Sequence, residues 1–119
     1  MCGICGGLNL GAGPPVGEET LADMIASLRH RGPEETGSYR DARVGLGHAR
    51  LAVLDLAGGR QPIANEDGSI RIVYNGEIFN HPELRADLEK RGHRFATRTD
   101  TEVIVHLYEE AGPGCVEAL

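Results

Sequence analysis

Cys2 is the residue with the clearest potential for chemistry, because it lies directly behind the initiator methionine. A small second residue permits removal of Met1, and Cys2 would then carry a thiol and a free α-amine. The amine, directly or through a water molecule, can act as the base that activates the thiol. By itself this signal is weak, because a cysteine at position 2 is usually an inert small residue, so the surrounding sequence has to decide between the two interpretations.

Six short motifs follow one another along the chain and supply the context for Cys2. They are CGICGG, RHRGPEETG, HARLAVLDL, GRQPI, YNGEIFNH and RTDTE. In this order they resemble the class II glutamine amidotransferases, the N-terminal-nucleophile family that hydrolyses glutamine. The form of YNGEIFN is most similar to the glutamine-hydrolysing asparagine synthetase branch, and less similar to the glucosamine-phosphate synthase and phosphoribosyl amidotransferase branches. The resemblance extends from Met1 to about Gly112.

The resemblance implies which residues take part in catalysis. Cys2 corresponds to the nucleophile that attacks the side-chain amide of glutamine. Asn75 and Gly76 correspond to an oxyanion hole, in which a side-chain NH₂ group and a backbone N–H donate to the developing negative charge. Without the other motifs, Asn75-Gly76 would be interpreted as a hairpin turn between two strands.

The resemblance also implies how glutamine is held. Arg50 corresponds to the residue that clamps the α-carboxylate, for which a planar guanidinium is well suited. Glu77 and Asp100 correspond to the acids that receive the α-ammonium group, and Val53 to a residue that contributes backbone contacts. Asp100 has the competing role of a negative charge at a helix N-terminus, and Arg50 that of a surface residue at a strand end.

Some residues near the motifs are predicted to lie outside the site. In RHRGPEETG, Glu34 replaces the Asp that is usual in the family, and neither it nor Arg29 and Arg31 is assigned to the active site. Cys2 and Cys5 have C-x-x-C spacing, which leaves a metal or redox interpretation open. No second cysteine pair or histidine pair at zinc spacing accompanies them, and the histidines are scattered singly. We therefore predict no metal in this part of the protein, with Cys5 as a small packing residue.

Composition excludes several function classes. The net charge of −6 argues against a nucleic-acid partner, because a phosphate-binding surface would show clustered Lys and Arg. No apolar run approaches membrane-spanning length, and the N-terminus lacks the pattern of a signal peptide. The odd number of cysteines, three, then favours reduced thiols and a cytoplasmic location.

The spacing of apolar residues and turn signals predicts the elements that position these residues. We expect a glycine-rich strand over 2–10 and a helix whose apolar face is Leu21, Met24, Ile25 and Leu28, capped by Thr20. Strands are expected over 38–55, 69–79 and 93–97. Helices are expected from Pro82 to Gly92 and from a capping box at Thr99–Glu102 to Gly112-Pro113, the latter with Val103, Ile104, Leu107, Tyr108 and Ala111 inward.

Strands in runs with helices between them predict an α+β domain, and the resemblance implies the four-layer αββα stacking of N-terminal-nucleophile hydrolases. Residues 1–119 would be a partial glutamine amidotransferase domain, without the synthetase domain. The glutaminase reaction needs no cofactor, whereas ATP and Mg²⁺ would belong to the synthetase domain or subunit that receives the ammonia. Asparagine is the expected product, but another acceptor and a non-catalytic scaffold domain stay open, as does a homodimer of the full-length enzyme. A chain ending at GCVEAL is expected to be aggregation-prone and a weak or inactive glutaminase.

Overall fold

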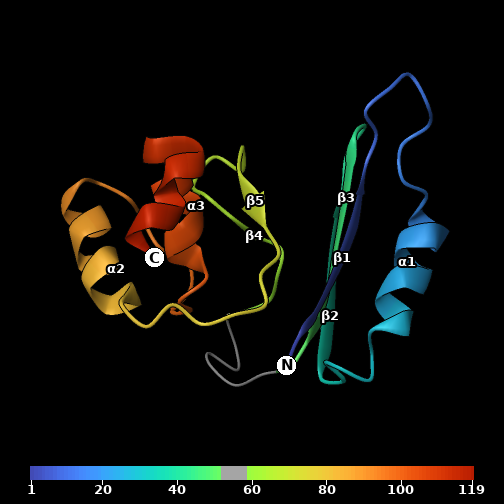
Figure 1. Ribbon diagram of the computed structural model, residues 1–119, viewed down its shortest axis with the longest axis horizontal. Coiled ribbons are helices and arrows are strands. Elements are labelled where there is room, and N and C mark those ends of the chain that lie inside the picture. Colours follow the sequence, from blue (N-terminus) through green and yellow to red (C-terminus); the bar gives the residue numbers. More distant parts are fainter. Residues whose placement is uncertain (52–58) are drawn as a thin grey trace. The chain divides into compact units, whose positions relative to one another are not determined.

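The computed structural model describes residues 1–51 and 59–119, which divide into two units. Of the described residues, the first unit contains 1–51, 60–62 and 73–75, and the second contains 59, 63–72 and 76–119. Each unit combines strands with helices (Figure 1). Val53 and most of the predicted LAVLDL strand lie outside the described residues.

The first unit is an antiparallel sheet with one helix packed on it. Its strands lie in the order β1-β3-β2, and their bounds are Gly3–Leu8 for β1, Val44–Arg50 for β3 and Glu35–Arg40 for β2. The helix α1, Glu18–Ser27, lies along one face of this sheet (Figure 1). The predicted glycine-rich strand and the predicted helix are therefore confirmed.

Glycines on β1 and β3 explain how closely α1 approaches the sheet. A Cβ added to Gly47 would lie 2.6 Å from both Cys5 Sγ and Ile25 Cγ1, and one added to Gly3 would lie 2.8 Å from Leu28 Cβ. Side chains alternate between the two faces of a strand, so the odd-numbered residues of β1 and β3 face α1. The even-numbered residues, which include His48 and Arg50, face the other way.

The start of α1 differs from the sequence prediction. The helix begins at Glu18, two residues before the predicted cap Thr20, and Gly17 is its N-cap residue without a side-chain hydrogen bond. Two acidic residues in the first turn, Glu18 and Glu19, supply the negative charge that favours a helix N-terminus. The apolar face is as predicted at Leu21 and Ile25, which are buried.

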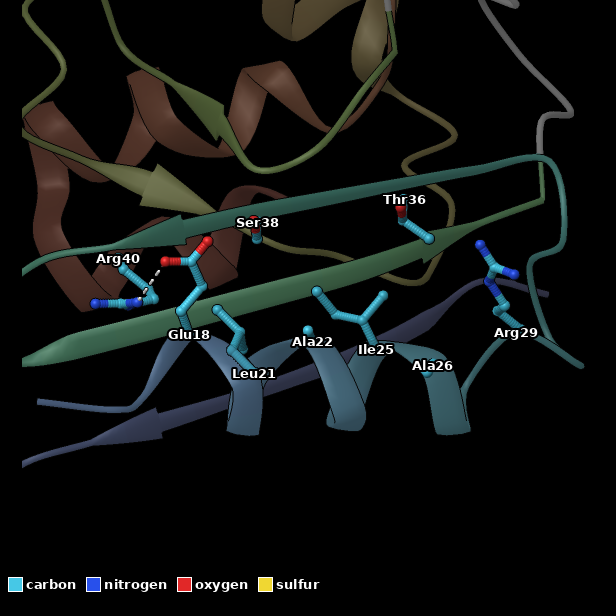
Figure 2. Close-up of a pocket in the computed structure, with 9 residues that line it drawn as sticks. All are labelled: Glu18, Leu21, Ala22, Ile25, Ala26, Arg29, Thr36, Ser38 and Arg40. Carbon is cyan, nitrogen blue, oxygen red and sulfur yellow. Dashed lines mark ion pairs between the residues drawn. The ribbon is translucent and has the colours of Figure 1, made fainter.

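A cleft of about 290 Å³ lies between α1 and β2 (Figure 2). Leu21 and Ile25 form its apolar side, and Thr36, Ser38 and Arg40 line it from β2. These β2 residues are paired with Ala49, Gly47 and Gly45 of β3, which is why they share the face that carries α1. Among the described residues, none of the predicted site residues lines the cleft.

The second unit is built around the helix α3, Glu102–Ala111. This helix lies between the helix α2, His81–Lys90, and a hairpin formed by β4, Ile63–Ala64, and β5, Arg71–Ile72 (Figure 1). A 3₁₀ helix, η1, follows over Gly112–Ala118. Pro82 at the start of α2 and Gly92 after its end, with φ of 104°, match the predicted helix boundaries.

Four predictions for this unit are wrong in whole or in part. Residues 93–97 form no strand, and of the expected strand over 69–79 only Arg71–Ile72 is one. On α3, Tyr108 and Ala111 are exposed instead of buried, whereas the polar residue His106 is buried. The capping box also fails, since the N-cap residue Thr101 is helical, with φ of −58° and ψ of −35°, and makes no side-chain cap hydrogen bond.

The Glu102 side chain, which would complete a capping box, forms hydrogen bonds with the preceding loop. Its carboxylate accepts the N–H groups of Ala96 and Thr97, at 2.7 and 2.6 Å, and the Thr97 hydroxyl at 2.6 Å. The side chain is turned away from the helix it begins and orders the loop before it. A carboxylate that is 1% exposed needs such donors, because an unsatisfied buried charge is costly.

The described residues thus form sheets and helices, which confirms the α+β class. The four-layer αββα stacking stays a prediction. Within the described ranges, no helix combines the length and the apolar character that a bilayer-spanning segment requires.

Candidate active site

Cys2 lies at the start of β1, on the sheet face opposite α1. Gly3 faces α1, and the neighbouring residue of an extended chain points to the other face. The Cys2 thiol is half-buried, accepts the N–H of Leu51 at 3.3 Å and lies 3.6 Å from the Leu51 carbonyl oxygen. The nucleophile candidate is therefore held against the residue that follows Arg50.

Arg50 ends β3 on the same face and at the same end of the sheet as Cys2. Gly3 pairs with Ala49 in the antiparallel ladder of β1 and β3. Continuing this register by one residue places Cys2 opposite Arg50. The Arg50 side chain is only 6% exposed, and its Nη1 lies 3.0 Å from Oε2 of Glu35, the directly opposed residue of β2. A guanidinium has five N–H donors in a planar fork, so the Glu35 contact is compatible with binding a further carboxylate.

Glu35 has a second basic neighbour, since Arg60 Nε lies 3.9 Å from its other oxygen. The acid is half-buried, whereas Arg60 is exposed. The positive charges of Arg50 and Arg60 around one carboxylate give this end of the sheet a charge pattern suited to an anionic group. Glu35 was not among the residues predicted from the sequence.

His48 is buried between these groups and the segment 73–75. Burial, together with the positive charge of Arg50, lowers the pKa of His48, and the backbone hydrogen bond with Tyr74 and the charge of Glu35 oppose this only in part. The imidazole is 1% exposed and is therefore held neutral as a packing residue. This agrees with the packing or surface role predicted for the histidines.

The segment that carries Asn75 is anchored to the first unit. The Tyr74 N–H donates to Gln61 Oε1 at 2.5 Å, and Gln61 is itself buried. Asn75 comes directly after this anchor and is exposed, so its amide group is accessible to solvent. No strand or hairpin is formed at Asn75-Gly76, so the hairpin interpretation finds no support in the structure.

The remaining predicted site residues lie in the second unit. Gly76 and Glu77 are exposed, as a substrate-binding loop requires. Asp100 is 6% exposed; its Oδ2 accepts the N–H of Ile78 at 2.8 Å, and its Oδ1 accepts the Thr101 hydroxyl at 3.3 Å. Asp100 therefore orders the loop that follows Glu77, a role that sequence reasoning did not assign to it.

The whole chain, residues 1–119, matches the family described as glutamine amidotransferase domain. The chain belongs to this family.

Its curated relatives include glutamine-hydrolysing asparagine synthetases. Asparagine synthetase 2 of Bacillus subtilis is 46% identical over 121 residues, which cover 98% of this chain and 16% of the relative. Asparagine synthetase 1 of Arabidopsis thaliana is 44% identical over 119 residues, which cover 100% of this chain and 20% of the relative. The amidotransferase chain thus spans a fifth or less of the length of these relatives.

Arg31, which sequence reasoning set aside, contacts the candidate nucleophile. Its Nε donates to the carbonyl oxygen of Cys2 at 3.0 Å, across 29 positions of sequence. This contact fixes the backbone of the nucleophile candidate from the loop after α1. The motif RHRGPEETG singled the loop out, but nothing in its sequence indicates which of its arginines reaches Cys2.

The C-x-x-C interpretation is not supported by the geometry. Residues three apart on a strand point to opposite faces, and Cys5 lies on the α1 side, where its Sγ is close to Gly47. Burial raises the pKa of the Cys5 thiol, which disfavours the thiolate that a metal or redox role needs. Within the described ranges, no cysteine belongs to a cluster of metal-binding groups.

Proposed function

We propose that this amidotransferase domain hydrolyses glutamine to glutamate and ammonia, with the Cys2 thiol as nucleophile once Met1 has been removed. The observation that carries the proposal is the pairing of Cys2 and Arg50 on one face and at one end of the β1-β3 ladder. A thiol and a carboxylate-binding guanidinium at neighbouring positions suit a substrate whose reacting amide and α-carboxylate belong to one small molecule.

The reaction proceeds in two stages. The Cys2 α-amine accepts the thiol proton, and the thiolate attacks the amide carbon of glutamine to give a tetrahedral intermediate. The Asn75 side chain and the Gly76 N–H stabilise its oxyanion. Collapse breaks the C–N bond, the proton passes to the leaving nitrogen, and ammonia departs from a γ-glutamyl thioester. Water then hydrolyses the thioester, which releases glutamate and restores the thiol.

Charge complementarity holds the zwitterionic end of the substrate. Arg50 binds the α-carboxylate, while Glu77 and Asp100 receive the α-ammonium group. Asp100 acts partly by ordering the loop after Glu77 through Ile78. Val53 contributes backbone contacts.

The ammonia supplies an amide synthesis in a synthetase domain or subunit. Because the relatives named above are glutamine-hydrolysing asparagine synthetases, we propose aspartate as the acceptor and asparagine as the product. That second reaction would use ATP and Mg²⁺, whereas the hydrolysis described here uses the residues of this chain and water. A homodimer of the full-length enzyme is part of the same proposal.

A covalent-trapping experiment tests the role of Cys2. Mass spectrometry of the protein treated with an electrophilic glutamine analogue should show Met1 absent and one adduct on Cys2. Cys2→Ala should abolish glutamate formation, whereas Cys5→Ala, on the opposite sheet face, should retain it. Equal loss in both variants, or full activity in protein that retains Met1, would contradict the mechanism.

A further inference from the structure

Two histidines and two glutamates converge in the second unit, and none of them is among the residues assigned above to glutamine hydrolysis. Glu66 belongs to the turn between β4 and β5, His93 follows α2, and His106 and Glu109 lie three residues apart on one side of α3. One side-chain ligand atom from each of the four lies within 4.8 Å of the other three. We propose that this cluster binds a divalent transition metal ion, Zn²⁺ in the first instance.

His106 provides the observation that points to a ligand. Its ring is 1% exposed, and among the described residues neither of its nitrogens has a hydrogen-bond partner. Nδ1 lies 3.3 Å from Glu66 Oε2 and Nε2 lies 3.6 Å from Glu102 Oε1, but neither contact has the geometry of a hydrogen bond. A buried imidazole without hydrogen-bond partners is costly, and a metal ion bound to Nδ1 removes part of that cost.

The spacing of the groups fits tetrahedral coordination. Bonds of 2.0–2.1 Å from zinc to nitrogen and oxygen place neighbouring ligand atoms about 3.3 Å apart. His93 Nδ1 lies 3.3 Å from Glu66 Oε1 and 3.9 Å from Glu109 Oε2, and His106 Nδ1 lies 3.3 Å from Glu66. The cluster therefore needs only small side-chain movements to close around one ion.

The outer contacts also match those of metal-binding histidines, which commonly donate their second ring N–H to a carboxylate. His93 Nε2 lies 3.1 Å from Glu110 Oε1, and His106 Nε2 faces the buried Glu102. Both imidazoles thus turn Nδ1 toward Glu66 and Nε2 toward another acid. For His93, the hydrogen bond of Nε2 to Glu110 favours the tautomer that leaves the Nδ1 lone pair available to a metal ion.

The two carboxylates of the cluster, Glu66 and Glu109, also accept hydrogen bonds from residues outside it. The Arg94 N–H donates to Glu66 Oε1 at 2.8 Å, and Asn65 Nδ2 donates to Glu109 Oε2 at 3.2 Å. Two neutral imidazoles and two carboxylates give a net charge that a dication would neutralise. Imidazole ligands favour zinc and its neighbours over Mg²⁺ and Ca²⁺, which prefer sites built from oxygen alone.

A bound ion would connect three segments that are distant in sequence: the β4-β5 turn, the residue after α2, and α3. It would therefore stabilise the second unit without entering the glutamine reaction. The zinc proposal does not depend on the proposed glutamine hydrolysis, because none of the four ligands is a predicted glutamine contact.

Isothermal titration calorimetry of the full chain with ZnCl₂ tests the site. We expect one ion per chain, and the same result in Cys2→Ala, which excludes binding by the reactive thiol. Glu109→Gln and His93→Asn should each weaken binding at least about 10-fold, the lower bound seen even for changes in the outer contacts of metal sites. Glu109 is exposed, so its replacement by an isosteric amide leaves the fold intact.

Matched controls are Glu117→Gln and His30→Ala, which alter an exposed acid and an exposed histidine outside the cluster. Both should bind zinc as the unaltered chain does. At the same zinc concentration, zinc should also raise the melting temperature of the unaltered chain and of both controls by more than that of Glu109→Gln. Absence of saturable zinc binding, or equal affinity in Glu109→Gln and Glu117→Gln, would overturn the proposal.

Discussion

Replacing Glu35 by glutamine probes how the candidate glutamine-binding residue Arg50 is held in place. The Glu35 carboxylate accepts a hydrogen bond from Arg50 Nη1 at 3.0 Å, on directly opposed positions of β2 and β3. Arg50 is almost fully buried, whereas about a third of the Glu35 side chain is accessible. Glu35→Gln keeps the shape of the side chain and removes the negative charge that orients the guanidinium.

The magnitude follows from the kind of contact. A hydrogen bond to a charged group contributes about 1.5–3 kcal/mol, and solvent access at Glu35 places this pair near the lower end. Because about 1.4 kcal/mol corresponds to a factor of ten, the KM for glutamine should rise roughly 10-fold if the guanidinium loses its orientation. The kcat should change little, since the α-carboxylate is bound equally in the ground state and the transition state.

The assay is glutamate release at varied glutamine concentration, with Glu34→Gln as the matched control. Glu34 is the adjacent acid, and it is exposed. Its backbone N–H donates to the Arg50 carbonyl oxygen on β3, a hydrogen bond that the substitution leaves in place. Its neutralisation should leave KM unchanged. An identical KM in the two variants, or a lower KM in Glu35→Gln, would refute the positioning role of Glu35.

Three other expectations concern the same unit. Asn75→Ala should lower kcat by about 10²–10³ with little change in KM, as expected for an oxyanion donor, and wild-type kinetics would exclude that role. Gly37→Ala should lower the unfolding free energy by about 1–3 kcal/mol in a denaturant titration, because its Cβ would lie 1.8 Å from the Gln61 carbonyl oxygen; Gly13→Ala, with no atom closer than 3.7 Å, should be silent. Since the pKa of His48 is lowered in the folded protein, the stability that its neutral form contributes is complete above about pH 6.5 and is lost as the pH falls below that value. The melting temperature should therefore decline less between pH 7 and pH 5 in His48→Gln than in the unaltered chain.

Local patterns were sufficient to predict most elements of the fold. The apolar spacing of Leu21 and Ile25 located α1, and Pro82 with Gly92 located α2, because these signals depend on residues a few positions apart. The strand predicted over 93–97 is not formed, because backbone N–H groups in this segment donate to a side chain and not to a neighbouring strand. The pattern alone could not show that the Glu102 carboxylate replaces strand pairing for Ala96 and Thr97.

Some residues of the candidate site could also be predicted from the sequence, and others could not. Cys2, Arg50 and Asn75 could be assigned by resemblance, whereas Glu35 and Arg31 act through contacts that only the folded sheet creates. The proposed metal site is a stronger case of contacts that the sequence does not indicate. His93 and His106 are separated by 12 intervening residues, which matches no short zinc motif, and Glu66 reaches them from a separate hairpin.

Register is the feature of the first unit on which its chemistry depends most. On β3, glycine and alanine at the odd positions allow α1 to approach, and His48 and Arg50 at the even positions face away from it. A slip of one residue would exchange these faces, turning Arg50 toward α1 and separating it from Glu35 and Cys2. The clash expected for any Cβ at Gly47, 2.6 Å from Ile25, excludes larger residues from the helix side. The same small residues that admit the helix therefore keep the thiol and the guanidinium together on the opposite face.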